Sequence, residues 1–469
     1  MTGQRGDDGA GADVAVVGAG VSGLVVAWRL QRAGLAVRVL DAAPRPGGVI
    51  GTVARDGLLF ERGPNSALDT TPLIGALVRE LGLHDALRPA SATAARRYVV
   101  RGGRLVALPT SLAAFFATPL FSPRAKLALL REPFVARSAA NVEESIAGFV
   151  RRRLGREFLD YAIDPFVAGV YAGDPDAISV RAAFPKLHAL EQRWGSLIRG
   201  QILGARERRR QAQTSKHTAA SFSFALGMQQ LTDALASALP AVHLDTRVLR
   251  LERDPAGPYT LYAEQAGAPR TWRARAVVLG VPADAAAALL APHDADAAAA
   301  LREIGYAPVA TVASAYRAGD VGHPLDGFGC LVPRLEARRV LGVLFSSSMF
   351  DGRAPAGHVL LTTFVGGMRQ PQLANASPDE IAALAHDEHT ALLGVRALPR
   401  FQAVTRWPRA IPQYTLGHEG RVARADAARR VLPGVFFCAN WKGGVAVGDC
   451  IRNAHAEADA VQAWLRQAP

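Results

Sequence analysis

A glycine-rich turn near the start of the chain constrains the fold more than any other feature. An apolar segment, residues 13–17, runs directly into Gly18-Ala19-Gly20-Val21-Ser22-Gly23, and a helix-like stretch follows as far as Gly34. A second apolar segment ends at Asp41, at the spacing of about 20 residues that a Gly-x-Gly-x-x-Gly fingerprint requires. A strand, this turn, a helix and a later carboxylate together predict a parallel α/β sheet that binds a dinucleotide.

Each part of the fingerprint has a physical role. Gly18 permits the tight turn, Gly20 lets the backbone approach a pyrophosphate, and Gly23 lets the helix and the strand pack closely. The free N–H groups and the dipole at the helix N-terminus favour the anionic pyrophosphate. Asp41 is expected to accept hydrogen bonds from a ribose hydroxyl.

The residues after Asp41 distinguish FAD from NAD. Pro44-Arg45-Pro46-Gly47-Gly48 follows directly. An acidic residue, then Arg and Gly-Gly, resembles the second signature of the flavoprotein oxidase superfamily, which includes amine oxidases, phytoene desaturases and porphyrinogen oxidases. The resemblance implies that the Arg45 side chain and the backbone of Gly47 and Gly48 lie beside the phosphates of FAD. An ordinary Pro/Gly turn would explain this segment alone, but the two motifs together favour FAD as the cofactor.

Length and charge narrow the class of protein. At 469 residues the chain exceeds the usual size of one hydrophobic core, so two or three domains are expected. The net charge of +13 favours a carboxylated substrate or a phospholipid surface over nucleic acid. Three scattered cysteines suit neither a metal site nor a disulfide framework. Because no secretory signal and no apolar spanning run is found, a reduced, cytoplasmic location is expected.

Three domains are expected from the order of the segments. Residues 13–90, 222–284 and 400–469 are predicted to form a Rossmann-type FAD-binding domain built from discontinuous segments. Residues 285–399, where strands and helices alternate, are predicted to form an α+β substrate-binding domain. Residues 91–221 are predicted to form a small, mainly helical domain for membrane association and substrate entry. The fold class is therefore α/β.

The stretch 108–135 is the basis for the membrane interpretation. Leucines and phenylalanines are cut by prolines into short pieces, and Arg124, Lys126 and Arg131 lie along them. Short apolar helices with a basic edge can lie in a membrane interface without spanning it. A helical subdomain packed on its own core is the alternative. A second basic stretch, residues 206–217, is interpreted as a solvated surface loop.

Over nearly its full length the chain resembles one family, the oxygen-dependent protoporphyrinogen oxidases of haem biosynthesis. Each motif is weak alone, but their order and spacing are specific, because amine oxidases and desaturases share only the FAD segments. The motifs are Phe60-Glu61-Arg62-Gly63-Pro64-Asn65-Ser66, Arg97-Tyr98-Val99-Val100, Asp164-Pro165-Phe166-Val167-Ala168-Gly169, Ser221-Phe222-Ser223-Phe224, Thr362-Thr363-Phe364-Val365-Gly366-Gly367 and Lys442-Gly443-Gly444-Val445-Ala446-Val447-Gly448.

The resemblance implies a substrate site. Arg97 would hold a substrate propionate, because a guanidinium binds a carboxylate bidentately. Gly169 would face the pyrrole N–H groups through its carbonyl, and Leu331, Leu344 and Phe364 would sandwich the macrocycle. Without the resemblance, Arg97 would be a surface residue and the three apolar residues would be core. No side chain is expected to be catalytic and no metal is expected, because the cofactor carries the chemistry.

The resemblance also implies the FAD contacts, among which Val248 would touch the adenine end through its backbone. The expected contacts are Gly18, Ala19, Gly20, Val21, Ser22, Gly23, Asp41, Arg45, Gly47, Gly48, Val49, Gly63, Pro64, Asn65, Ser66, Val248, Trp407, Val445, Ala446 and Val447. Four residues depart from the family pattern: Asp41 replaces a usual Glu, Val49 an Arg or Trp, Trp441 a Tyr or His, and Ala172 a Gly. Of these, Ala172 is expected to narrow the substrate pocket.

The activity that the resemblance implies is oxidation of protoporphyrinogen IX to protoporphyrin IX in two-electron steps. Each step would pass a hydride to flavin N5, and dioxygen would then reoxidise the flavin and yield hydrogen peroxide. The enzyme would lie peripherally on the cytoplasmic face of the membrane. A homodimer and handover of the product to ferrochelatase are candidate partnerships, and no nucleic-acid partner is expected.

Other activities remain open at this point. Coproporphyrinogen III oxidation is the same chemistry on a more carboxylated ring, although Arg97 and Phe364 favour protoporphyrinogen. A flavin amine oxidase or a carotenoid desaturase is a more distant alternative. An amine oxidase usually needs an aromatic cage and a lysine near the flavin, and Lys442 is the only candidate for that lysine. A non-catalytic FAD-binding scaffold or redox sensor would lack the substrate motifs.

Overall fold

The first sheet has the nucleotide-binding topology that the glycine fingerprint predicts. The computed structural model describes residues 11–139, 142–203, 220–254 and 257–467. In the sheet, strands run in the order β10-β2-β1-β13-β12-β11, and β19 also pairs with β13. The pairs of β1 with β2 and β13 are parallel, whereas β11, β12 and β13 form an antiparallel ribbon. The strands are β1 Ala12–Val17, β2 Val37–Leu40, β10 Val242–His243, β11 Thr246–Arg253, β12 Tyr259–Gln265, β13 Ala268–Leu279 and β19 Val435–Phe437.

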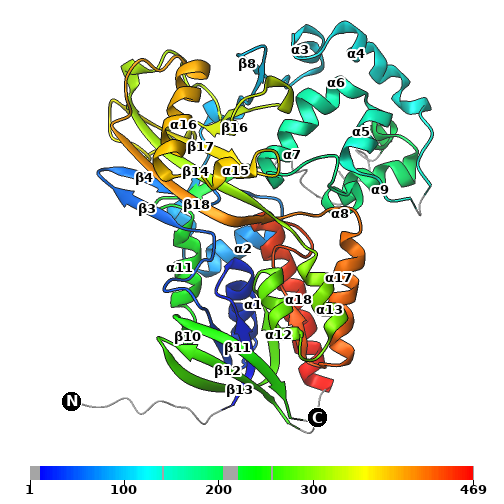
Figure 1. The fold of residues 1–469 in the computed structure, drawn as a ribbon, viewed down its shortest axis with the longest axis vertical. Coiled ribbons are helices and arrows are strands. Elements are labelled where there is room, and N and C mark those ends of the chain that lie inside the picture. The colour runs from blue at the N-terminus through cyan, green and yellow to red at the C-terminus, as the bar shows by residue number, and fades with distance from the viewer. Residues whose placement is uncertain (1–10, 140–141, 204–219, 255–256, 468–469) are drawn as a thin grey trace.

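Helices cover both faces of this sheet, so β1 and the last residues of β13 are buried and read as continuous apolar runs. One face packs against α1 Val21–Arg32, α2 Pro72–Glu80, α11 Gln229–Ser237 and α18 Val447–Gln467. The other packs against α12 Ala283–Leu290, α13 Ala295–Arg302 and α17 His418–Ala427. Figure 1 shows α1 and α18 side by side, although they come from opposite ends of the chain.

A second, largely antiparallel sheet lies beyond the first. Its order is β18-β14-β17-β16-β15-β7-β8, and only the pair of β15 with β7 is parallel. One face packs against α16 Pro378–Leu393 around a core rich in valines and leucines. The strands are β7 Tyr98–Arg101, β8 Arg104–Ala107, β14 Tyr306–Arg317, β15 Gly329–Leu331, β16 Val340–Leu344, β17 His358–Gly366 and β18 Phe401–Pro412. Short helices α14 Ser346–Met349 and α15 Pro371–Ala374 lie at its loops.

The structure also has two small sheets, which are separate from the two large ones. The hairpin of β3 (Thr52–Arg55) and β4 (Leu58–Glu61) leads into the predicted FAD segment 63–66. In the other, β9 (Ser221–Phe224) pairs with β5 (Ala67–Leu68) and with β6 (Leu87–Pro89). The Ser-Phe-Ser-Phe motif is therefore a buried central strand, and Ser221 Oγ at its start donates to Ser66 Oγ at 3.1 Å.

A helical unit occupies the end of the molecule opposite the first sheet (Figure 1). Its helices are α3 Leu112–Ala117, α4 Pro123–Ala128, α5 Ile146–Arg153, α6 Arg156–Phe158, α7 Asp164–Tyr171, α8 Val180–Ala183 and α9 Pro185–Trp194. Arg153 is fully buried and forms ion pairs with Glu132 and Glu191, which are buried as well. Breaking one partner of such a pair leaves an uncompensated buried charge, so the network fastens the segment 129–134 to α5 and α9.

The fold is thus mixed α/β with parallel and antiparallel sheets, as predicted, but the strand partners cross the predicted domain boundaries. Strands β7 and β8 (98–107) and strand β18 (401–412) belong to the second sheet, not to the helical and FAD-binding domains. Helices α12 and α13 (283–302) pack on the first sheet, not in the substrate domain. The prediction followed the order of segments along the chain, whereas a sheet recruits strands by backbone pairing, whatever their distance in sequence. The predicted loop at 206–217 lies wholly within the segment 204–219, outside the described residues.

Candidate active site

The three fingerprint glycines are required for different reasons. A Cβ at Gly18, where φ is +110°, would lie 2.6 Å from the Gly280 carbonyl oxygen, and a Cβ at Gly23 would overlap the Gly18 carbonyl oxygen. A Cβ at Gly20 would meet no protein atom within 4 Å. Gly20 also caps α1 without any side-chain hydrogen bond to the first N–H groups. The space beside Gly20 therefore fits a pyrophosphate in contact with an open helix N-terminus.

Asp41 lies at the end of β2, beside the turn, as the fingerprint predicts. Its carboxylate accepts hydrogen bonds from the backbone N–H groups of Ala19 and Ala43, the latter at 2.7 Å. The shorter side chain of Asp, compared with the usual Glu, therefore bonds to the turn itself. Each oxygen keeps a further lone pair, so the contact with a ribose hydroxyl stays a prediction.

The second motif folds back onto the first. The N–H of Gly47 donates to the Ala19 carbonyl at 2.8 Å, and Gly47 forms a parallel bridge with Gly20. The Arg45 guanidinium donates to the carbonyls of Gly48 and Ile50, at 2.9 and 2.7 Å. Arg45 therefore shapes its own loop through carbonyl oxygens, and this places the exposed backbone of Gly48 beside the turn. Contact of Arg45 with a phosphate stays a prediction.

The segment Gly63-Pro64-Asn65-Ser66 lies between the two motifs and the second sheet. A Cβ at Gly63 would overlap the Val49 carbonyl oxygen, so only glycine fits there. The carbonyl of Arg62 accepts hydrogen bonds from Trp407 Nε1 at 2.7 Å and from Thr311 Oγ1 at 3.2 Å. Trp407, predicted to contact FAD, thus holds the residue before Gly63 in place.

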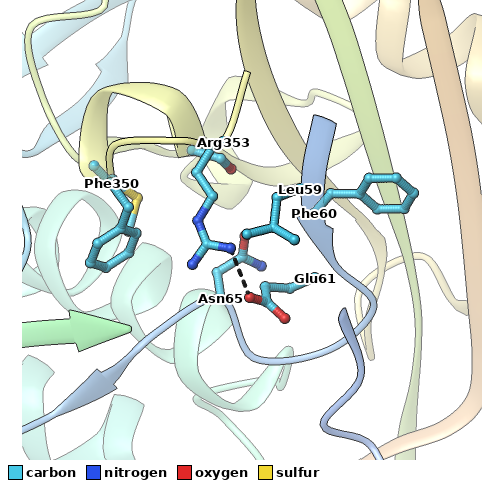
Figure 2. A pocket seen from close by; sticks show the side chains of 8 residues that line it. Leu59, Phe60, Glu61, Asn65, Phe350 and Arg353 are labelled. Carbon is cyan, nitrogen blue, oxygen red and sulfur yellow. Dashed lines mark hydrogen bonds and ion pairs between the residues drawn. The ribbon is translucent and has the colours of Figure 1, made fainter. Parts of the chain in front are cut away.

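A small pocket behind this segment contains a buried ion pair, shown in Figure 2. Arg353 points toward Glu61 and lies 3.3 Å from it, and both side chains are 3% exposed. Glu61 also accepts from Thr52 Oγ1 and the Met228 N–H, and Arg353 donates to Ser223 Oγ at 2.6 Å. Burial raises the pKa of Glu61. The β3–β4 hairpin, residues 223–228 and the loop that carries Arg353 are therefore held together immediately before the segment 63–66.

The last predicted FAD contacts lie on the remaining sides of the same region. The N–H of Thr246 donates to the Asp41 carbonyl at 2.7 Å, which brings β11 and Val248 to the end of β2. Ala446 is exposed, and Val445 packs, half-buried, against the helical unit. Gly448, at the start of α18, lies against Leu68. The predicted FAD residues thus surround one continuous region, although the contacts with FAD themselves stay predictions.

One face of the second sheet gathers the apolar residues predicted to bind the substrate. Leu331 and Phe364 are both register partners of Gly342, and Leu344 lies two residues after Gly342. Cross-strand partners and residues two apart point to the same side of a sheet, so all three side chains share this face. It lies opposite the α16 core, and all three residues are only half-buried.

Helix α7 covers this face at its edge. A Cβ at Gly169 would lie 2.8 Å from Leu331 Cδ2, so glycine allows the helix to approach the sheet. Asp164, at the start of α7, forms a buried ion pair of 2.7 Å with Arg369, which follows β17. Arg369 also donates to the Val332 carbonyl at 2.9 Å. Sequence reasoning missed this pair, although Asp164 opens the motif that was used for Gly169.

Arg97 differs from the arginines beside it in having no carboxylate partner among the described residues. Arg96 pairs with Asp326, and Arg101 pairs with Glu157. The Arg97 guanidinium instead lies over the Phe328 ring, 5.1 Å from its centroid. It remains exposed to solvent, yet partial desolvation lowers its pKa. Arg97 lies two residues before Val99, the register partner of Leu331, and so belongs to the edge of the apolar face.

Two further residues bear on the sequence-based expectations. Lys442, the candidate amine-oxidase lysine, forms an ion pair of 2.7 Å with Asp426 of α17. Ala172 ends α7 in the left-handed region at φ +47° and is 2% exposed. Glycine adopts that conformation at no steric cost, which explains the usual Gly at this position physically. Pocket narrowing by Ala172 stays a prediction.

Comparison with known proteins identifies the family. The family described as flavin containing amine oxidoreductase matches residues 21–462. Protoporphyrinogen oxidase 2 of Arabidopsis thaliana is 34% identical over 97% of this chain and 94% of its own. The coproporphyrinogen III oxidase of Bacillus subtilis is 27% identical over 96% and 98% of the two chains.

The fold has a close counterpart among solved structures. A protein of Exiguobacterium sp. 255-15, whose crystal structure has been solved, superposes with a TM-score of 0.79 at 23% identity, over 96% of this chain and 98% of that one. At this identity the likeness shows the fold alone. The sequence relatives and the flavin family match confirm the expected family and cofactor. The chain therefore belongs to the flavin-containing amine oxidoreductases, where it groups with the protoporphyrinogen oxidases, and it is an oxidoreductase whose cofactor is FAD.

Proposed function

We propose that this enzyme oxidises protoporphyrinogen IX to protoporphyrin IX in haem biosynthesis, with dioxygen as electron acceptor and hydrogen peroxide as the second product. One observation carries the substrate assignment: a partly desolvated arginine without a carboxylate partner, Arg97, lies at the edge of a half-buried apolar face. A porphyrinogen has this character, because its ring is apolar and its propionates are anionic. The protoporphyrinogen oxidases among the relatives support the same substrate.

The residues of this face have different roles in binding the substrate. Leu331, Leu344 and Phe364 exclude water from the macrocycle and hold it by contact area. Arg97 binds one propionate, and this orients the ring relative to the FAD-binding region. Gly169 lets α7 approach Leu331, so that the helix borders the ring at one edge of the face. FAD supplies the capacity to accept a hydride, which carries two electrons, and the protein supplies orientation and a dry site.

Coproporphyrinogen III is the second candidate substrate, and the coproporphyrinogen III oxidase of Bacillus subtilis supports it. Purified holoenzyme should be mixed in air with each porphyrinogen in turn, and porphyrin fluorescence and peroxide followed. We expect faster turnover of protoporphyrinogen IX. Faster turnover of coproporphyrinogen III would move the enzyme to the other substrate, and no turnover of either would refute the proposal.

We also propose that the helical unit docks on the cytoplasmic face of a membrane. Its outer surface carries five large, exposed apolar side chains on α3, α4 and the segment 129–134: Leu112, Phe116, Leu127, Leu130 and Phe134. Phe121 and Phe158 stack beneath them, so the unit has a core of its own in addition to this exposed surface. Arg124 and Arg131 are exposed nearby and suit anionic headgroups. Among the described helices, none has the length and apolarity needed to cross a bilayer.

Flotation with vesicles that contain anionic phospholipid tests this proposal. The holoenzyme should float with the vesicles at low salt. The double variant Phe116→Ser, Phe134→Ser should stay in the soluble fraction and keep its FAD. Leu398→Ser removes an equally exposed side chain from another surface, so this control should float like the parent. Equal flotation of the double variant would exclude the helical surface as the docking site.

A further inference from the structure

Residues 440–446, in the connection between β19 and α18, are held by an unusual set of hydrogen bonds. We call them the closing loop. It leaves the first sheet beside β13 and enters α18, whose Gly448 lies against Leu68 and Thr70. Thr70 and Leu68 follow the predicted FAD segment 63–66. The closing loop therefore borders the region that the predicted FAD residues surround.

Four successive carbonyls of the closing loop accept hydrogen bonds from side chains. Asn440 accepts from the Tyr414 hydroxyl at 2.7 Å, and Trp441 accepts from His418 Nε2 at 2.9 Å. Lys442 accepts from Asn453 Nδ2 at 3.1 Å, and Gly443 accepts from Arg452 Nη2 at 3.2 Å. Two of these donors come from α18 itself, whereas Tyr414 and His418 come from the segment after β18.

Tyr414 closes the loop with a single hydroxyl. The oxygen donates to the Asn440 carbonyl and also accepts from the N–H of Gly444 at 2.8 Å, so it joins the two ends of the turn. Tyr414 is 1% exposed, and water does not compete for these bonds. Gly443 and Gly444 have φ of +78° and +128°. Such glycines have wide backbone freedom, so the turn needs external contacts to keep one shape.

His418 supports both the loop and the tyrosine. Its ring stacks on Tyr414 with centroids 4.1 Å apart and planes 13° from parallel. The Trp441 carbonyl can only accept, so the bond requires a proton on His418 Nε2. Burial lowers the pKa of His418 to about 4, and the ring is therefore neutral at pH 7 with its one N–H at this position. Sequence reasoning did not identify either residue.

We propose that Tyr414 and His418 are positioning residues for FAD, which act by holding the closing loop in its binding shape before the cofactor arrives. The proposal rests on FAD as the cofactor and is independent of which porphyrinogen is oxidised. A loop ordered in advance loses less conformational entropy on binding, and this raises affinity without any direct contact from the two side chains. Removing the tyrosine hydroxyl leaves one carbonyl and one N–H without a partner and lets the turn open.

The test is titration of the apoprotein with FAD, with no substrate present, so that its result is separate from any failure of porphyrinogen turnover. Tyr414→Phe should raise the FAD dissociation constant at least tenfold and alter the visible flavin spectrum. Tyr171→Phe is the matched control: Tyr171 is buried beside Tyr414, but its hydroxyl donates weakly to Ala183, 3.3 Å away, and not to the closing loop. It should change the dissociation constant by less than twofold.

Two variants of His418 keep the proposal testable if Tyr414→Phe fails to fold. His418→Gln can place an amide N–H near the Nε2 position, so it should keep more FAD affinity than His418→Ala, by about fivefold or more. Far-ultraviolet circular dichroism of each apoprotein checks folding. Unchanged FAD affinity in folded Tyr414→Phe would overturn the proposal. Equal losses in the two tyrosine variants, or in the two histidine variants, would do so as well, because core damage would then explain them.

Discussion

At the nucleotide turn, the decisive contacts are between backbone atoms of neighbouring segments, whereas on the substrate face they are between side chains from distant strands. Gly18, Gly23 and Gly63 are required because a Cβ would overlap or crowd a carbonyl oxygen. Leu331 and Phe364 share a face only because two strands pair with β16. A site made by the backbone tolerates few residue types, whereas a site made by side chains can change its ligand without changing the fold.

The largest expected effects come from two glycines of the same turn, Gly20 and Gly23, whose substitution should have different consequences. Gly20→Val should give a folded protein without FAD, because the added Cβ meets no protein atom within 4 Å while the side chain fills the space expected for the pyrophosphate. Gly23→Val should fail to fold, because its Cβ would overlap the Gly18 carbonyl. Flavin absorbance and circular dichroism of the purified variants measure both outcomes. A yellow Gly20→Val protein would place the pyrophosphate elsewhere.

On the second sheet, acidification should weaken folding through a buried histidine. His389 of α16 is fully buried and hydrogen-bonds to Tyr316 and to Thr363 of β17. Burial lowers its pKa to about 3, from 6.5. The contribution of neutral His389 to the free energy of unfolding is complete above pH 6.5. It is lost, at about 1.4 kcal/mol per pH unit, as pH falls toward 3. Unfolding midpoints between pH 7 and 4 measure this loss.

A matched pair of variants assigns this dependence to one residue. His389→Gln should flatten the pH dependence, whereas His386→Gln, on the same helix and only half-buried, should preserve it. The comparison of slopes is unaffected by any constant loss of stability. If the unfolding midpoint of both variants keeps the full pH dependence, the acid sensitivity arises in another part of the molecule.

Arg97→Ala tests the substrate face without touching the nucleotide turn. Loss of a charge-assisted hydrogen bond costs about 1.5–3 kcal/mol, so KM for protoporphyrinogen IX should rise roughly 10- to 100-fold while FAD stays bound. Arg97→Lys should recover only part of this, because an ammonium group cannot bind a carboxylate in the bidentate way. Arg104→Ala, an exposed position of the same hairpin, is the control and should leave KM unchanged. Loss of the yellow cofactor from Arg97→Ala would contradict the assigned role.

The smallest effect concerns the end of α7. Ala172→Gly should stabilise the protein by about 0.5–1 kcal/mol, because the left-handed backbone at this position favours glycine. Ala168→Gly, inside the same helix, should destabilise it by about 1 kcal/mol. Thermal unfolding of the two variants should therefore shift in opposite directions. A lower midpoint for Ala172→Gly would mean that the packing of its methyl group outweighs the strain.

The difference between the two regions also explains what could be predicted from the sequence. The strand, turn and helix around Gly18–Gly23 are local, and their spacing alone predicted the first sheet. Leu331, Leu344 and Phe364 carry no local signal, and only the family resemblance nominated them. Their common face depends on strand register, which no short segment determines.

The same limit applies to the residues that support the site. Arg353 reaches Glu61 from a distant loop, and Tyr414 reaches Asn440 of the closing loop across 26 positions of the chain. In the sequence, neither Arg353 nor Tyr414 differs from any other residue of its type, because its partner becomes close only in the folded structure. Strand pairing and helix packing cross the predicted boundaries near residues 91, 285 and 400 for the related reason that neither depends on chain order.

The position of β19 has a consequence for biosynthesis. The first sheet begins with β1 at residue 12, but β19 and α18, which cover the side of β13 and α1, come from residues 435–467. Domains fold as units during translation, from the N-terminus onward. Here α18 and β19 can cover α1 and β13 only after residues 435–467 have been synthesised, so this side of the first sheet stays partly uncovered until then. We therefore expect stable FAD binding only after this segment has folded, and a variant without residues 435–467 should expose the apolar side of α1 and β13.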